Sequence, residues 1–200
     1  NVMIKGVNDH EIYEIINLSN RYPNIRSITI QNMTFTGQGG SEFTPHERLT
    51  LDMAARIIEE KSMEEILMKN FFPLPSNHPL CYNIAYFFKT DSGLKSFTDI
   101  LPKDKLIELI GSSYIMHPDE KFNDTFNEAI TSSWVDERND DLLLFIKRLL
   151  KKMYPRDRSL TPFERQQIAE ESILTVYIHA HMDEENFDIS RIVCCTDLVP

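Results

Sequence analysis

Residues 1–32 read NVMIKGVNDHEIYEIINLSNRYPNIRSITIQN. The first apolar stretch, Val2 to Val7, has the length of a strand, and Asn8-Asp9 supplies a turn and a helix cap before apolar residues at helical spacing. Branched side chains then fill Ile25 to Ile30, which predicts a second strand. A strand, a helix and a strand at this spacing predict a parallel unit with a right-handed crossover. We therefore expect an α/β fold whose polar strand ends face a ligand.

The rest of the chain continues with both kinds of element. A helix is expected from Thr44 or Thr50 onward, a short helix over Met63 to Lys69, and strands over Cys81 to Lys89 and Ile173 to His181. The region 103–172 is expected to be mainly helical, with 142–153 as its clearest amphipathic helix. Three prolines within 71–81 exclude a regular element and predict a rigid loop.

Composition excludes several classes of protein. The 31 acidic and 21 basic residues give a formal net charge of -10, which would repel a phosphate backbone, so no nucleic acid partner is expected. No apolar run approaches the roughly 20 residues of a transmembrane helix. Three cysteines, two of them adjacent, make a poor disulfide framework and favour a reducing compartment, so we expect a cytoplasmic location.

The start of the sequence indicates a piece of a longer protein. The chain begins at Asn1 without an initiator methionine and enters an apolar strand at once. No secretory leader precedes that strand, so removal of a signal peptide does not account for this start. We expect truncation on both sides.

Close pairs of thiol or imidazole groups fall in three places in the sequence, and the acidic residues Asp183, Glu184 and Glu185 in a fourth. Thiolate and neutral imidazole are usual ligands for zinc or for iron-sulfur iron, although scattered groups of this kind are also found as buried thiols and surface histidines. The acidic group is expected to be a solvated turn, since it lacks the spacing of a calcium loop. The three places are His78-x-x-Cys81, His179-x-His181 and Cys194-Cys195.

Four stretches, taken together and in order, resemble the radical S-adenosylmethionine proteins related to archaeal tetraether lipid synthase and to the methylases that modify pterin precursors. The resemblance covers nearly the whole chain. The four stretches are Ile4 to His10, Ile30 to Gly37, Phe72 to Cys81, and Met182 to Asp188 with Cys194-Cys195.

The resemblance implies a fold and a cofactor. In that family a Cys-x3-Cys-x2-Cys motif, which this sequence lacks, holds a 4Fe-4S cluster that cleaves S-adenosylmethionine to a radical. Residues 1–70 would be the late part of a partial parallel α/β barrel with flanking helices, and residues 71–200 a mixed α+β auxiliary region, truncated. Asn8, Asp9 and Gln31 would lie near S-adenosylmethionine or substrate, with turn capping and strand-end solvation as the alternative roles.

The resemblance also implies metal ligands. In relatives the proline loop carries cysteines before and at the position of Cys81 that help to bind an auxiliary cluster, whereas Ser76 and Asn77 occupy the earlier positions here. Serine is a poor iron ligand beside thiolate, which leaves Cys81, Cys194 and Cys195 as the candidate ligands. These three cysteines are expected to converge in space.

The expected function is that of a fragment of a radical enzyme acting at an unactivated carbon, by carbon-carbon bond formation or methyl transfer. Its substrate would be a small molecule or a lipid chain, and the rest of the parent chain would supply the radical cluster. The fragment alone is expected to be inactive. The alternatives are a non-catalytic binding or scaffolding module of the same fold and a small zinc protein.

Overall fold

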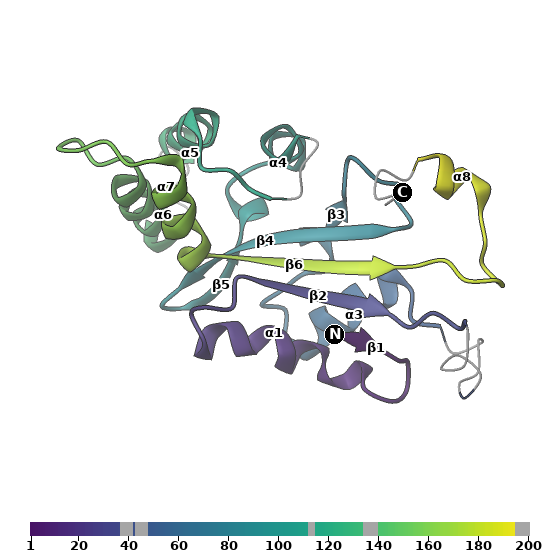
Figure 1. The fold of residues 1–200 in the computed structure, drawn as a ribbon. Coiled ribbons are helices and arrows are strands. Elements are labelled where there is room, and N and C mark those ends of the chain that lie inside the picture. Colours follow the sequence, from purple (N-terminus) through teal and green to yellow (C-terminus); the bar gives the residue numbers. More distant parts are fainter. Residues whose placement is uncertain (37–41, 43–47, 112–114, 134–139, 195–200) are drawn as a thin grey trace.

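The structure is a computed structural model that describes residues 1–36, 42, 48–111, 115–133 and 140–194 (Figure 1). One six-stranded mixed sheet runs through it, in the order β1-β2-β6-β4-β3, with β5 also paired to β4. The α/β fold class expected from the sequence is confirmed. The strands are β1 (Val2–Met3), β2 (Ser27–Asn32), β3 (Phe72–Pro73), β4 (Tyr82–Thr90), β5 (Gly93–Ser96) and β6 (Ile173–Ala180).

The parallel unit predicted from residues 1–32 is confirmed. Strand β1 pairs in parallel with β2, and α1 (Ile12–Arg21) connects them. Strand β6 extends the parallel part by pairing with β2, and β4 then pairs antiparallel with β6. A strand near the end of the chain thus lies between β2 and β4 and joins residues 1–70 to the later part in one sheet. The division into two domains at residue 70 stays a prediction.

Helices cover the sheet on both faces (Figure 1). One core lies between the sheet and the helices α1 and α3 (Leu51–Lys61), and it contains Ile28 and Ile30 of β2. The other core lies between β4 and four later helices and is rich in phenylalanine, with the Phe88 and Phe97 rings stacked 4.0 Å apart. The four later helices are α4 (Lys103–Ile110), α5 (Glu120–Ser133), α6 (Asp140–Met153) and α7 (Pro162–Ser172).

The two faces of β2 differ in polarity, and this difference positions the candidate site. Ile28 and Ile30 are buried against α1 and α3, whereas Ser27 and Thr29 on the other face are exposed and Gln31 is partly exposed. In Figure 1 no helix is drawn over the middle of β2 and β6. A parallel strand normally buries both faces. This polar face is therefore left open to solvent or to a ligand.

Three local expectations from the sequence are wrong. The first strand ends at Met3, because the chain turns at Gly6, whose φ of +76° suits glycine. The expected helix over 63–69 is absent, since positive φ values at Met63 and Glu64 end helical geometry and only the 3-10 turn Met68–Asn70 follows. Pro73 lies within a regular element, the two-residue β3 that pairs with β4. Proline is tolerated there because β3 is at the edge of the sheet.

Three further short helices complete the described chain: the 3-10 turns Asp9–Glu11 and Phe97–Asp99, and α8 (Ile189–Val193). Within the residues described, no helix has the length and apolar character needed to span a membrane.

Candidate functional site

The carboxyl ends of the parallel strands β1, β2 and β6 meet at one edge of the sheet, where the antiparallel β4 begins. Residue pairing places Val2, Gln31, His179 and Tyr82 in one row across these strands. Helix α8 lies at the same edge (Figure 1). Ligands of α/β proteins bind beyond the carboxyl ends of parallel strands, so this edge is the candidate functional site.

A hollow of about 170 Å³ lies at this edge. Its walls come from the loop before β4, the first residues of β4, the end of β6 and α8. The described residues that line it include no aspartate or glutamate; they are Asn77, His78, Cys81, Tyr82, His179, Ala180, His181, Met182 and Arg191.

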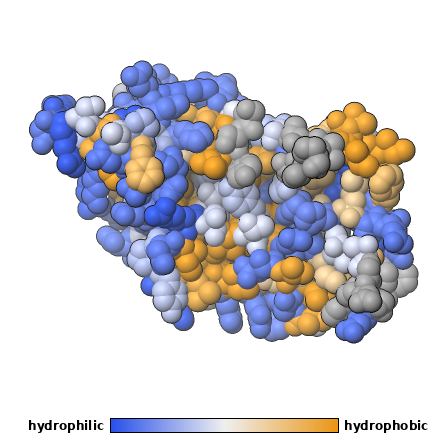
Figure 2. Space-filling view, in the orientation of Figure 1, coloured by the Kyte–Doolittle hydropathy of each residue, from blue (hydrophilic) through white to orange (hydrophobic). Residues whose placement is uncertain are grey.

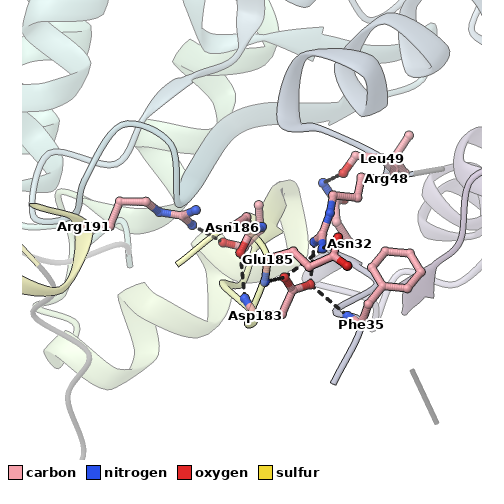
Figure 3. A network of polar contacts seen from close by, with 9 residues as sticks. Asn32, Phe35, Arg48, Leu49, Asp183, Glu185, Asn186 and Arg191 are labelled. Carbon is pink, nitrogen blue, oxygen red and sulfur yellow. Dashed lines mark hydrogen bonds and ion pairs between the residues drawn. The ribbon is translucent and has the colours of Figure 1, made fainter. Parts of the chain in front are cut away.

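Arg191 joins α8 to both strands beside this hollow. Its Nε donates a hydrogen bond to Cys81 Sγ at 3.3 Å, and its Nη2 donates to the Ala180 carbonyl at 2.7 Å. Figure 3 shows the Arg191 side chain among the polar residues at this edge. Although arginine is rarely buried, Arg191 is only 7% exposed. Polar contacts from this one side chain therefore attach α8 to the sheet.

Helix α8 exposes two of its three apolar residues. Ile189 is 69% exposed and Val193 80% exposed, and Figure 2 shows apolar residues gathered on the surface at α8. A surface helix normally buries its apolar side chains and exposes its charged ones. Arg191 therefore holds α8 to the sheet, and Asp188 Oδ1 caps the helix itself by accepting from the Ser190 N–H at 2.8 Å.

Three histidines line the hollow. The His179 ring stacks on Tyr82 at 3.8 Å and lies 3.8 Å from the His181 ring. Desolvation, together with the positive charge of Arg191, lowers the pKa of His181 below its ordinary value. His78 Nδ1 accepts from the Leu80 N–H at 3.2 Å, so a neutral His78 carries its proton on Nε2. The hollow thus contains imidazole groups that can donate to a ligand.

A buried ion pair fastens the loop after β6. The Asp183 side chain is fully buried and accepts from both Nη atoms of Arg48, at 2.5 and 2.8 Å (Figure 3). It also accepts from the N–H groups of Phe35 at 2.9 Å and Glu185 at 3.2 Å. Burial alone would raise the pKa of the Asp183 carboxyl, but the hydrogen bonds from Arg48 and Phe35 outweigh it and the pKa is lowered. The expected solvated turn is wrong for Asp183, which instead connects segments 135 residues apart.

Asn32, the last residue of β2, holds the segment before α3 against the strand. Its Nδ2 donates to the Leu49 carbonyl at 2.5 Å, next to the Arg48 pair (Figure 3). The side chain is 3% exposed, and its Oδ1 has no hydrogen-bond partner among the described residues. Asn32 and Asp183 together fix the two chain segments that leave β2 and β6 at the site edge.

The cofactor-binding candidates lie at this edge with different surroundings. The side-chain amide of Asn8 donates to the Val2 carbonyl at 3.0 Å and accepts from the Ile4 N–H at 2.7 Å. The backbone of a neighbouring parallel strand would make the same two hydrogen bonds, one to the Val2 carbonyl and one from the Ile4 N–H. Asn8 therefore takes the place of a further strand at the outer edge of β1. Asp9 begins a 3-10 turn, and Gln31 lies on the open polar face of β2. Their binding roles stay predictions.

The three candidate metal ligands are placed unequally. Cys81 is partly buried and contacts Arg191, Cys194 is exposed at the end of α8, and Cys195 lies outside the described residues. No three histidine, cysteine or acidic residues in the described part of the chain are grouped so that they could hold a metal ion. The described residues alone therefore do not fit an iron-sulfur cluster or a zinc ion, and the convergence of the three cysteines stays a prediction.

Comparison with known proteins finds a relative that matches part of the chain. Over 79 residues the chain is 30% identical to the 7,8-dihydro-6-hydroxymethylpterin dimethyltransferase of Methanocaldococcus jannaschii. The match covers 39% of this chain and 16% of that enzyme, so the chain spans much less than the length of this relative. No family model matches the chain. The name of this relative describes a pterin methylase. Pterin methylases are one of the two kinds of protein that the sequence resembles, beside tetraether lipid synthase.

Sequence reasoning missed Arg191, Arg48 and the burial of Asp183. Arg191 meets Cys81 across 110 residues, and its helix is too short to show a periodic pattern. The acidic run after β6 is composed like a solvated loop, and no local feature distinguishes Asp183 from its neighbours. The pairing of β6 with both β2 and β4 creates these contacts, and residue spacing does not reveal such a pairing.

Proposed function

We propose that this chain is part of a radical S-adenosylmethionine enzyme and forms one wall of its active site. The observation that carries the proposal is the open polar face of the parallel strands β2 and β6. Ser27, Thr29 and Gln31 line it on β2, and Thr175 and Tyr177 continue it on β6. A strand that lines a ligand site presents a few polar groups to the ligand and packs its apolar face against helices.

A second hollow over this face supports the proposal. It measures about 410 Å³ and lies between the open face and α7. That volume is within the usual range of small-molecule sites. Its polar lining includes Ser27, Thr29, Thr175 and Tyr177 from the strands and Gln166 and Glu170 from α7.

We propose methyl transfer as the reaction class, with a small heterocyclic molecule as the substrate. The similar protein from Methanocaldococcus jannaschii is named as a dimethyltransferase of a pterin, and this favours methyl transfer over the coupling of lipid chains. The radical would come from a cluster held by other parts of the parent protein, because this sequence lacks the three-cysteine motif. The role of the described residues is to bind and orient S-adenosylmethionine or substrate.

Gln31 is the residue of this wall that we propose contacts S-adenosylmethionine or the substrate. It lies one residue before the carboxyl end of β2 and is partly exposed on the open face. A carboxamide both donates and accepts hydrogen bonds, which suits the mixed polar groups of a nucleoside or a pterin. The row that Gln31 shares with His179 and Tyr82 adds imidazole and aromatic surface.

The proposal is tested by measuring S-adenosylmethionine binding to the parent protein, expressed with the sequence that precedes residue 1 in its gene. Gln31→Ala should weaken the binding of S-adenosylmethionine or of substrate about fivefold, the size of one lost hydrogen bond. Asn20→Ala is the matched control, because it removes a carboxamide exposed on α1, on the opposite face. Absence of S-adenosylmethionine binding would refute the proposed function. Equal effects of the two substitutions would refute the role of Gln31.

A further inference from the structure

The guanidinium group of Arg191 is a buried positive charge with neutral neighbours. Its two acceptors are the Cys81 sulfur, a weak acceptor, and the Ala180 carbonyl. Among the described residues no carboxylate oxygen lies within 4.0 Å of its nitrogens. Burying an ion is strongly unfavourable unless an opposite charge or strong hydrogen bonds compensate it. No carboxylate of the described residues therefore compensates the charge of Arg191 directly.

The two nearby acidic residues have other partners. Asp188 lies close enough for Arg191 to help lower its pKa, after the larger effect of its hydrogen bonds from Ser190. Its Oδ1 accepts from the Ser190 N–H at 2.8 Å and from the Ser190 hydroxyl at 2.7 Å. Asp183 is bound to both Nη atoms of Arg48. Neither carboxylate pairs with Arg191.

The hollow beside Arg191 has room and donors for an anion. Its volume of about 170 Å³ equals that of about five to six water molecules at ~30 Å³ each. Only two of the five guanidinium N–H groups have the acceptors described above, so three can serve a ligand. The Nε2–H of neutral His78 is a further donor in the wall. The lining residues that the structure describes include no carboxylate that would repel a negative ligand.

We propose that this hollow binds a small oxyanion, either an inorganic anion or the carboxylate or phosphate group of a larger ligand, held by Arg191. Arginine suits this ligand because its planar donors match two oxygens of one group. The bound anion would also hold α8 against the sheet, since Arg191 attaches that helix. The inference rests on the buried guanidinium and its hollow and does not depend on the proposed function.

The test titrates the 200-residue chain with inorganic phosphate and, separately, with acetate at constant ionic strength. Backbone amide signals of residues 180–182 and the Arg191 Nε–H signal are followed by nuclear magnetic resonance. We expect saturable shifts of these signals with at least one anion and, with it, a higher melting temperature. Preference for phosphate would indicate a phosphate group as the ligand, and preference for acetate a carboxylate.

Three variants make the test specific. Arg191→Gln should weaken binding about tenfold or more, as expected for the loss of a charged hydrogen-bond donor. Arg191→Lys should retain part of the binding, because it keeps the charge. Arg21→Gln, which removes an exposed arginine at the end of α1, should bind as the wild type does.

A fourth variant tests the alternative that a Cys81 thiolate, and not a bound anion, compensates the positive charge of Arg191. Cys81→Ser removes any thiolate but leaves the guanidinium, so it should still bind the anion. Three results would overturn the inference: no saturable shift with either anion, equal binding by Arg191→Gln and the wild type, or shifts that Arg21→Gln abolishes. If Arg191→Gln does not fold, the other two variants at the site decide. The inference is then overturned when Arg191→Lys binds the anion as tightly as the wild type and Cys81→Ser does not bind it.

Discussion

The contact between Arg48 and Asp183 should be among the most stabilising polar contacts in this protein. The Asp183 side chain has no solvent exposure, Arg48 is 23% exposed, and the hydrogen bonds between them are 2.5 and 2.8 Å long. Arg48→Ala leaves Asp183 buried with only backbone donors, and should cost about 3 kcal/mol in free energy of unfolding. Asp183→Ala leaves Arg48, which water can partly reach, and should cost about 2 kcal/mol.

The double-mutant cycle measures the interaction itself. Because each single substitution already removes the contact, the double variant should lose less than the sum, with a coupling energy of at least about 1 kcal/mol. Unfolding in urea, followed by far-ultraviolet circular dichroism, gives the four free energies. Lys105 and Glu108 provide the control, since this ion pair is 3.3 Å long but both side chains are about half exposed.

The control cycle should give less than about 0.5 kcal/mol, as is usual for exposed pairs. A coupling energy near zero for Arg48 and Asp183 would refute the reasoning. So would equal coupling in the two cycles, because burial would then have no effect on the strength of the contact.

The lowered pKa of Asp183 predicts that the free energy of unfolding depends on pH. The ionised carboxyl stabilises the fold fully above the ordinary aspartate pKa, and this stabilisation is lost as the pH falls through the folded-state pKa. The free energy of unfolding should therefore fall on acidification below about pH 4, and Asp183→Asn should flatten the decrease. Thr50 caps α3 by accepting from the Met53 N–H, so Thr50→Ala should cost about 1 kcal/mol in urea unfolding and Thr50→Ser almost nothing. Asn8→Ala removes both hydrogen bonds at the edge of β1 and should cost about 1 kcal/mol, whereas Asn8→Asp keeps the acceptor for the Ile4 N–H and should cost less.

Local patterns in the sequence predicted most of the elements. The apolar spacing that follows Asp9 and the branched residues before Gln31 identified α1, β2 and their parallel crossover, and the alternation after Ile173 identified β6. These features succeed because helix and strand periodicities are set by neighbouring residues. The loop of Met63 and Glu64 was missed because left-handed backbone at two such residues has no local signature.

The candidate site was harder to predict than the elements. The carboxyl-edge position of Gln31 and the proline-loop position of Cys81 followed from strand order and sequence pattern. The burial of Arg191 and the pairing of Asp183 depend on β6 entering the sheet between β2 and β4, a contact between distant parts of the chain. Charged residues are expected at the surface, so their burial is visible only in the structure.

The proposed function is tested most directly by measuring 5'-deoxyadenosine after anaerobic incubation with iron, sulfide, S-adenosylmethionine and a reductant. The 200-residue chain and the parent protein expressed with its upstream sequence are compared under the same conditions. We predict that the parent protein forms 5'-deoxyadenosine and that the 200-residue chain forms none above a control without protein, because its sequence lacks the three-cysteine motif. Formation of this product by the 200-residue chain alone, or its absence from the parent protein, would contradict the account.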